Sequence, residues 1–174
     1  MPNRLIEDKD AKILYELIEK NRKRFTPYFP VTTKEVYNLK SAKRFVKQKI
    51  DQAFFQEQYY FLVFDGASNL VGNVTAKNID LSVPKCELSY FIDIDSEGQG
   101  LMSKALDDLI RYCFESLKIK KIYLRIVPEN VSSIKLAEKK GFVLEGTHKM
   151  DFRTGEGRIV DVNYYALFHE REKS

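Results

Sequence analysis

The sequence predicts an α+β fold in which helices flank a mixed, mostly antiparallel β-sheet. Two observations support this class. Residues 59–94 contain three strand-like runs in succession, joined by turns, as in an antiparallel meander. Residues 86–127 then alternate strand, amphipathic helix and strand, which predicts one parallel βαβ crossover. With 174 residues, 44% of them hydrophobic and 31% charged, we expect a single soluble domain spanning 1–174.

The first third of the chain is expected to be mainly helical. Residues 4–6 predict a short first strand, and residues 10–24 predict a helix with one apolar face. Residues 26–30 end that helix. A second helical region is predicted from about 32 to 58, with a kink near Ser41.

Strand signals follow from residue 59 onward. Residues 59–64 are rich in aromatic and β-branched side chains, Asp65 and Gly66 form a turn, and residues 70–79 predict the partner strand of a hairpin. A third antiparallel strand is expected over 86–94. Its apolar residues alternate with its polar ones: Leu88, Tyr90, Ile92 and Ile94 lie on one face and Glu87, Ser89 and Asp93 on the other.

The segment Glu-Gly-Gln-Gly-Leu-Met-Ser at 97–103 connects this strand to a predicted helix over 100–117. Two glycines let the backbone adopt a positive φ and approach a ligand closely, and the helix presents unpaired N–H groups to the turn. The segment therefore predicts a site for a phosphate or diphosphate, although by residue type it fits a tight strand-to-helix connection equally well. Leu101 and Met102 stand where a nucleotide triphosphatase loop needs Lys and then Ser or Thr, and Ser103 departs from the dinucleotide-binding pattern.

The last third completes the sheet. Residues 119–127 predict a strand that runs parallel to the 86–94 strand, because such crossovers are right-handed. Residues 128–140 predict a helix that Gly141 ends. Residues 142–152 and 158–169 predict a closing hairpin.

Composition argues against several classes of protein. The chain has 29 basic and 25 acidic residues. Its one basic cluster, at 22–24, is followed by the aromatic residues Phe25, Tyr28 and Phe29, and such a run is more typical of a solvated helix end with a hydrophobic anchor than of a nucleic-acid surface. Direct nucleic-acid binding is therefore not expected. No apolar run reaches membrane-spanning length and no signal region is evident, so we expect a cytoplasmic protein with Cys86 and Cys113 as reduced core residues. Two histidines and two cysteines far apart in sequence predict no metal site.

Three motifs in order resemble the GNAT superfamily of acetyl-CoA-dependent N-acetyltransferases. They are the loop at 97–102, Pro-Glu-Asn-Val-Ser-Ser at 128–133, and Lys-Lys-Gly-Phe-Val-Leu-Glu-Gly at 139–146. The chain is most similar to the RimJ/RimL branch, the N-terminal acetyltransferases of ribosomal proteins. The resemblance covers nearly the whole chain and implies a GNAT-like fold with acetyl-CoA as co-substrate.

The resemblance also implies which residues hold the cofactor. It places the diphosphate on the backbone of Gly98, Gln99, Gly100, Leu101, Met102 and Ser103. It places the pantetheine arm between the 86–94 and 119–127 strands, along the backbone of Tyr90, Phe91 and Ile92. Asn130 is implied to bond the pantetheine and Ser133 to donate to the leaving sulfur. Considered by residue type alone, Asn130 is equally a helix N-cap and Ser133 an ordinary first-turn residue.

The sequence departs from the family pattern at two positions. Glu97 stands where the family usually has Gln or Arg, and a carboxylate there is expected to repel phosphate unless its side chain turns away. Ala137 stands where many members carry the Tyr that protonates the thiolate. The RimJ/RimL branch also lacks this Tyr, and its Asn-x-x-Ser pattern is matched by Asn130 and Ser133.

The general base is predicted to be Glu87, with Glu145 as the alternative, although each equally fits a solvated strand residue that pairs with a Lys. An α-amine, with a pKa of about 7.7–8.0, needs less help from a base than a lysine at about 10.4. The RimJ/RimL resemblance, which this chemistry allows, implies acetylation of the N-terminal α-amine of a protein such as a ribosomal protein, by a monomer or homodimer. The alternatives are a small-molecule amine acetyltransferase and a non-catalytic acyl-CoA-binding module.

Overall fold

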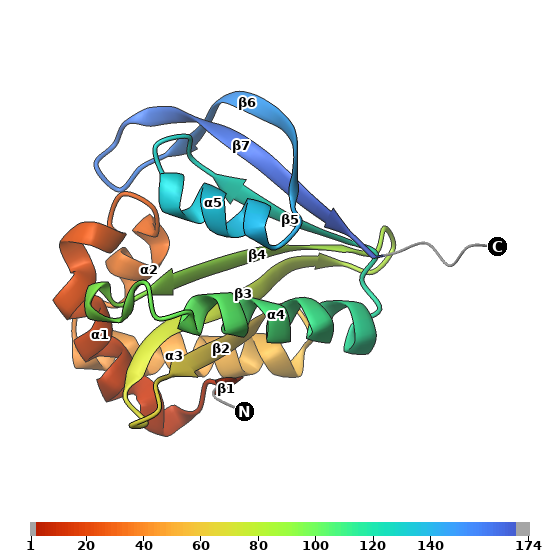
Figure 1. Cartoon of the computed structure of the whole chain (residues 1–174). Helices are drawn as coiled ribbons and strands as arrows, with labels where there is room; N and C mark the ends of the chain where they lie inside the picture. Colours follow the sequence, from red (N-terminus) through yellow and green to blue (C-terminus); the bar gives the residue numbers. More distant parts are fainter. Residues whose placement is uncertain (1–2, 170–174) are drawn as a thin grey trace.

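The computed structural model, described here over residues 3–169, contains one seven-stranded sheet in the order β1-β2-β3-β4-β5-β7-β6 (Figure 1). Neighbouring strands are antiparallel except β4 and β5, which are parallel. The predicted α+β class and its one parallel crossover are thus confirmed. The strands are β1 (Asn3–Leu5), β2 (Tyr59–Phe64), β3 (Leu70–Asp80), β4 (Lys85–Ile92), β5 (Lys121–Ile126), β6 (Val143–Arg153) and β7 (Ile159–Phe168).

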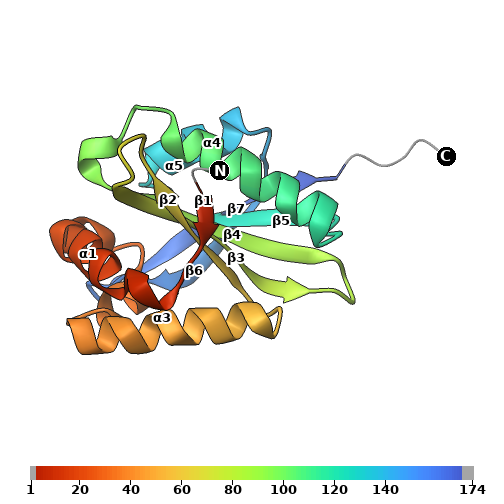
Figure 2. The same cartoon turned by 90° about the horizontal axis from the view of Figure 1, so that it is seen from below.

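Helices cover both faces of the sheet, α1 and α3 on one side and α4 and α5 on the other (Figure 2). The helices are α1 (Ala11–Phe25), α2 (Pro30–Glu35), α3 (Leu39–Phe54), α4 (Leu101–Arg111) and α5 (Val131–Lys139). A π-helical turn, Tyr112–Ser116, continues α4. The crossover helix predicted over 100–117 is therefore present at nearly its full length.

The core has a large apolar cluster on each side of the sheet, and a smaller third cluster is formed by Leu17, Phe25 and Phe91. In β2, Tyr60 and Leu62 pack with α1 and α3, whereas Phe61 and Val63 pack with the cluster under α4. A strand buried on both faces is apolar at every position, which explains why β2 reads as a continuous apolar run. Burying each such side chain stabilises the fold by about 1.5–3 kcal/mol.

The helical region predicted over 32–58 is two helices, and the predicted kink near Ser41 is wrong. The helices separate between Glu35 and Leu39, where Asn38 caps α3. Asn38 Oδ1 accepts a hydrogen bond from the Ser41 backbone N–H at 2.8 Å, and Ser41 Oγ accepts one from the Asn38 N–H at 3.0 Å. This reciprocal capping box marks a helix start, so Ser41 belongs to the first turn of a new helix.

The strand predicted over 86–94 ends at Ile92 because its last residues are tied to α1. Asp93 accepts hydrogen bonds from Lys20 Nζ at 2.5 Å and Asn21 Nδ2 at 3.0 Å. Asn21 Oδ1 in turn accepts from the Ile94 backbone N–H at 3.1 Å. Burial disfavours the charged form of Asp93, but the bonds from Lys20 and Asn21 outweigh it and lower the pKa of this carboxyl. The end of β4 is thereby fixed against α1.

We expect Asp93→Asn to lower the free energy of unfolding by about 1–3 kcal/mol, since it breaks a buried charge-assisted contact. Because the pKa of Asp93 is lowered in the folded state, its stabilisation is complete above the unfolded value of about 3.9. It is lost as pH falls through the folded value, so wild type and variant should converge in acid. Urea unfolding from pH 7 to pH 3 measures this.

Asp95→Asn is the matched control, because Asp95 also pairs with Lys20, at 2.7 Å, but its side chain is 73% exposed. Exposed ion pairs contribute about 0–1 kcal/mol. Equal losses of stability in the two variants would contradict the role given to Asp93.

The two cysteines, far apart in sequence, lie together. Cys86 of β4 and Cys113 of the π-helical turn are both fully buried and free, with their sulfur atoms 3.8 Å apart. The neighbouring Cys86 sulfur and burial raise the pKa of Cys113. Both thiols therefore belong to the core, as predicted.

Two kinds of feature, membrane-spanning helices and clusters of metal ligands, are absent from the described residues. None of their helices is long and apolar enough to cross a membrane, and they contain no group of three or more potential metal ligands.

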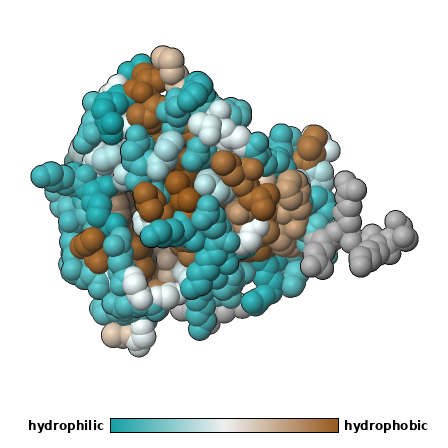
Figure 3. Space-filling model, turned by 45° about the horizontal axis from the view of Figure 1, so that its top comes forward, coloured by the Kyte–Doolittle hydropathy of each residue, from teal (hydrophilic) through white to brown (hydrophobic). Residues whose placement is uncertain are grey.

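Strand β6 forms one edge of the sheet and exposes Val143, Leu144 and Met150. On the face shown in Figure 3, apolar side chains form several separate patches in a mainly polar surface.

Candidate active site

The site forms where β4 and β5 separate. The two strands pair only from Lys85 to Glu87, opposite Lys121 to Tyr123. Beyond that point β4 continues to pair with β3, and β5 continues to pair with β7. Two adjoining cavities lie around this separation, and both are lined by Tyr28, Phe29, Tyr90, Asn130 and Ser133. The crossover connection thus opens a cleft inside an otherwise continuous sheet.

We call the cavity beside the glycine loop the loop cavity. It is lined by nearly all the residues implied to bind the cofactor. The predicted residues that line it are Tyr90, Phe91, Ile92, Gly98, Gly100, Leu101, Met102, Ser103, Asn130 and Ser133. Gln99 does not line it; its side-chain amide donates to the Asp95 carbonyl at 3.1 Å. Ten predicted residues from three separate chain segments therefore meet at one cavity.

The backbone of the glycine loop has the conformation that the sequence predicted. Gly98 and Gly100 have φ of +74° and +77°, in the left-handed region that favours glycine. Gly100 is the N-cap of α4, and a Cβ at either glycine would meet no atom within 4 Å. The loop is therefore open at both glycines, and the first turn of α4, at 101–103, lines the loop cavity. Such a helix start suits a diphosphate.

Glu97 turns toward α1 and is paired. Its Oε1 accepts a hydrogen bond from Arg24 Nη1 at 2.5 Å, and Arg24 Nη2 donates to the Ile92 carbonyl. The carboxylate expected to repel phosphate is thus offset by an arginine that also lines the loop cavity. The sequence offered no signal for this pair, because 73 positions separate the two residues.

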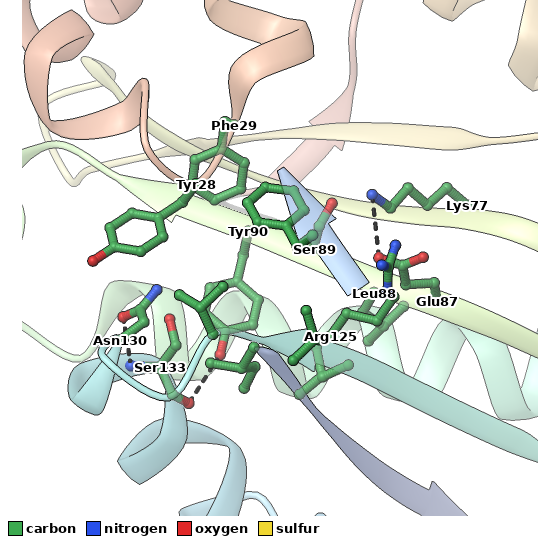
Figure 4. Close-up of a pocket in the computed structure, with 15 residues that line it drawn as sticks. Tyr28, Phe29, Lys77, Glu87, Leu88, Ser89, Tyr90, Arg125, Asn130 and Ser133 are labelled. Atoms are coloured by element: carbon green, nitrogen blue, oxygen red, sulfur yellow. Dashed lines mark hydrogen bonds and ion pairs between the residues drawn. The ribbon is translucent and has the colours of Figure 1, made fainter. Parts of the chain in front are cut away.

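Asn130 and Ser133 occupy the start of α5. Asn130 is the N-cap, and its Oδ1 accepts from the Ser133 backbone N–H at 3.3 Å. The capping interpretation is therefore correct for Asn130. The Ser133 hydroxyl makes no hydrogen bond to any residue within 3–169, although it lies in both cavities beside Tyr90 (Figure 4). It remains available to a ligand.

The side chain of Tyr90 also reaches α5. Its hydroxyl donates to the Ser133 carbonyl at 3.2 Å, and burial raises the pKa of Tyr90 to about 12. Only the backbone of Tyr90 was predicted to take part in the site. The phenol is a further donor at the junction of the two cavities.

The second cavity is lined by Glu87, the predicted general base, and we call it the base cavity. This side chain is buried, with Oε2 accepting from Asn78 Nδ2 at 2.8 Å and Oε1 3.3 Å from Lys77 Nζ. Figure 4 shows Lys77 and Arg125 extending toward Glu87. The alternative of a Lys-paired strand residue is thus half correct: Glu87 pairs with a lysine but is not solvated.

Glu145, the alternative base, lies elsewhere. It is exposed and forms an ion pair with Lys121 at 2.6 Å, and it lines neither cavity. Of the two predicted bases, only Glu87 lies at the cleft.

No residue of the segment 24–29 was predicted to hold the cofactor. Tyr28 and Phe29 line both cavities, and the ring of Phe29 packs on Phe91 of β4 with centroids 5.4 Å apart. Phe25 packs on Phe91 at 4.6 Å. The basic and aromatic run here was interpreted as a helix end with a hydrophobic anchor. Phe25 is indeed a buried anchor, but the residues around it line the cleft.

Arg22, which belongs to the same basic cluster but lines neither cavity, has a structural role. Its guanidinium donates to the carbonyls of Thr33 and Val36, each at 2.5 Å, and to Glu19 at 2.8 Å. These contacts hold the end of α2 against α1.

Comparison with known proteins identifies a family. The family model described as "Acetyltransferase (GNAT) domain" matches residues 4–143. The ribosomal protein uS5-alanine N-acetyltransferase of Escherichia coli (strain K12) is 31% identical over 161 residues, which cover 91% of this chain and 82% of that protein. The spermine/spermidine N(1)-acetyltransferase of Bacillus subtilis (strain 168) is 40% identical over 71 residues, which cover 41% of this chain and 45% of that protein.

A solved structure confirms the fold. The ribosomal-protein-S5-alanine acetyltransferase from Vibrio fischeri superposes with a TM-score of 0.90 and 24% identity, and the match covers 99% of this chain and 94% of that one. The resemblance inferred from the three motifs is therefore confirmed.

Proposed function

The chain belongs to the GNAT acetyltransferase family, and from that premise we propose that it acetylates the N-terminal α-amine of a protein. Family membership makes it an N-acetyltransferase with acetyl-CoA as co-substrate. The observation that supports the cofactor's placement is the open glycine loop at the mouth of the cleft between β4 and β5. The backbone of 98–103 would hold the diphosphate, and Tyr90 to Ile92 with Asn130 would hold the pantetheine arm.

The cofactor supplies an acetyl group activated as a thioester. The protein must then polarise the acyl carbonyl, stabilise the sulfur and accept the proton of the amine. Backbone N–H groups of β4 near Tyr90 to Ile92 would donate hydrogen bonds to the acyl carbonyl. The Ser133 hydroxyl would donate a hydrogen bond to the leaving sulfur. Glu87 would take the proton, directly or through water. The buried position of Glu87 in the cavity next to Ser133 supports this division of roles.

The choice of an α-amine rests on chemistry and on the relatives. An α-amine with a pKa of about 7.7–8.0 is partly neutral near pH 7, so a base that works through water suffices. The Escherichia coli relative, named for an alanine of a ribosomal protein, aligns with 91% of this chain. The spermine/spermidine relative aligns with 41% of it, which keeps a small polyamine as the second candidate.

An acceptor screen tests this proposal. We expect a higher kcat/KM for peptides with a free N-terminus, a small first residue and an early acidic residue than for spermidine, an aminoglycoside or N-terminally blocked lysine peptides. Free-thiol release reports turnover. Faster acetylation of spermidine or of the blocked peptides would overturn the α-amine assignment. Binding of acetyl-CoA without turnover on any acceptor would instead indicate the non-catalytic module.

Ser133→Ala should lower kcat by about 10-fold, less than the 10²–10³-fold reported for a strong oxyanion donor, because a thiolate is already a good leaving group. The Kd for acetyl-CoA should change little. Ser132→Ala is the control, since Ser132 lines the loop cavity and its hydroxyl donates to Asn130 at 3.1 Å. If thermal stability falls while kcat is unaffected, Ser133 serves only the helix start.

A further inference from the structure

Arg24 connects three parts of the cofactor site. It lies in the last turn of α1, and its guanidinium contacts both the Ile92 carbonyl at the end of β4 and Glu97 at the start of the glycine loop. Both contact partners line the loop cavity, as does Arg24 itself. Past Glu87, β4 no longer pairs with β5, so this arginine stands at the mouth of the cleft.

The bonding of Arg24 is incomplete. Its Nε is buried and has no hydrogen-bond partner among residues 3–169. Buried N–H groups rarely remain unpaired, because their lost hydration is not replaced. The guanidinium also presents parallel N–H groups in a plane, which matches the oxygens of a phosphate. Arg24 therefore has the geometry to bind an anionic ligand, and its hydrogen bonding within the protein is incomplete.

The charges around the loop cavity are balanced. Its charged lining residues are Arg24 and Lys139, which are positive, and Glu97 and Glu129, which are negative. A diphosphate on the loop would thus approach an arginine whose positive charge is already offset by Glu97. The diphosphate and the Glu97 carboxylate would then compete for the Arg24 guanidinium.

We propose that Arg24 is a ligand of the cofactor's diphosphate and that Glu97 is its replaceable partner. Phosphate oxygens take the place of the Glu97 carboxylate on the guanidinium, and the carboxylate turns to solvent, to which its side chain is already 45% exposed. Glu97 then competes with the cofactor for Arg24. This inference rests on the proposed placement of the diphosphate at 98–103 and is independent of the acceptor.

Competition and simple structural support predict opposite results. If the Arg24–Glu97 pair only holds α1 against the loop, removing either partner loosens the site and weakens cofactor binding. If Glu97 competes with the diphosphate, Glu97→Gln tightens binding and Arg24→Gln weakens it. The sign of the Glu97 effect therefore distinguishes the two.

The test is calorimetric titration of the full-length protein with CoA and with S-acetylpantetheine, which lacks the diphosphate. We expect Glu97→Gln to bind CoA about 3–10-fold more tightly and Arg24→Gln about 10-fold more weakly, the scale of one charge-assisted contact. The double variant should resemble Arg24→Gln. Binding of S-acetylpantetheine should change less than about twofold in every variant, since the partner of Arg24 is absent from it.

Controls separate this role from folding. Glu145→Gln makes the same chemical change in an exposed ion pair that lines neither cavity, and should leave CoA binding unchanged. Arg24→Lys keeps the charge without the planar fork, and its affinity should fall between wild type and Arg24→Gln. Thermal unfolding without ligand checks that each variant is folded.

Each outcome has a distinct meaning. Weaker or unchanged CoA binding by folded Glu97→Gln would overturn the competition, as would an equal gain for S-acetylpantetheine. If wild type bound CoA no better than S-acetylpantetheine, the placement of the diphosphate on the loop would itself be wrong. If wild type discriminated between them but Arg24→Gln bound CoA normally, only the role of Arg24 would be lost.

Discussion

Gly100→Asp should weaken acetyl-CoA binding by about 100-fold or more, a loss of about 2.7 kcal/mol. Two effects add. A side chain at φ of +77° costs about 1–2 kcal/mol of backbone strain, which favours a rearranged loop that no longer fits the cofactor, and the new carboxylate would stand where the diphosphate is proposed to lie. Titration calorimetry measures the change in Kd.

Gly157→Asp is a closely matched control. Gly157 also has a positive φ, +87°, and open space around it, but it belongs to the turn between β6 and β7 and lines neither cavity of the cleft. Both variants carry similar strain and the same added charge, so only Gly100→Asp should lose cofactor affinity. Equal affinities in the two variants would remove the glycine loop from the cofactor site.

Glu87→Gln should lower kcat/KM by about 10²–10³-fold if Glu87 is the general base, within the range for losing such a group. The amide keeps the size of the side chain and can still accept the hydrogen bond from Asn78. The Kd for acetyl-CoA should change little, because Glu87 does not line the loop cavity. Steady-state kinetics with a free N-terminal peptide tests this.

Glu145→Gln serves as the control, since that carboxylate pairs with Lys121 outside both cavities. A drop of less than about threefold in folded Glu87→Gln would exclude the base role, because general bases contribute far more. Water would then accept the proton. A large loss of thermal stability with normal kcat would instead assign Glu87 to the ion pair with Lys77.

Much of the fold was readable from the sequence because its signals act over short distances. Alternating apolar residues indicated the strands, and the 3.6-residue stripe indicated the crossover helix from 100 to 117. The positive φ of Gly98 and Gly100 and the N-cap at Asn130 also follow from local backbone chemistry. Boundaries failed where a local signal was overlooked, as with the capping box of Asn38 and Ser41 that divides α2 from α3.

Less of the site could be predicted, since its chemistry depends on residues that only folding brings together. The sequence was sufficient to predict the glycine loop, the start of α5 and the parallel pairing of β4 with β5. The tertiary structure alone decided that Asp93 is tied to Lys20, that Glu97 pairs with Arg24, and that Glu87 is buried beside Lys77. Asp93 and Glu97 each lie 73 positions from their partners, far beyond the reach of helix or strand periodicity. Their burial and charge balance depend on how α1 packs against the end of β4, and no local pattern encodes that packing.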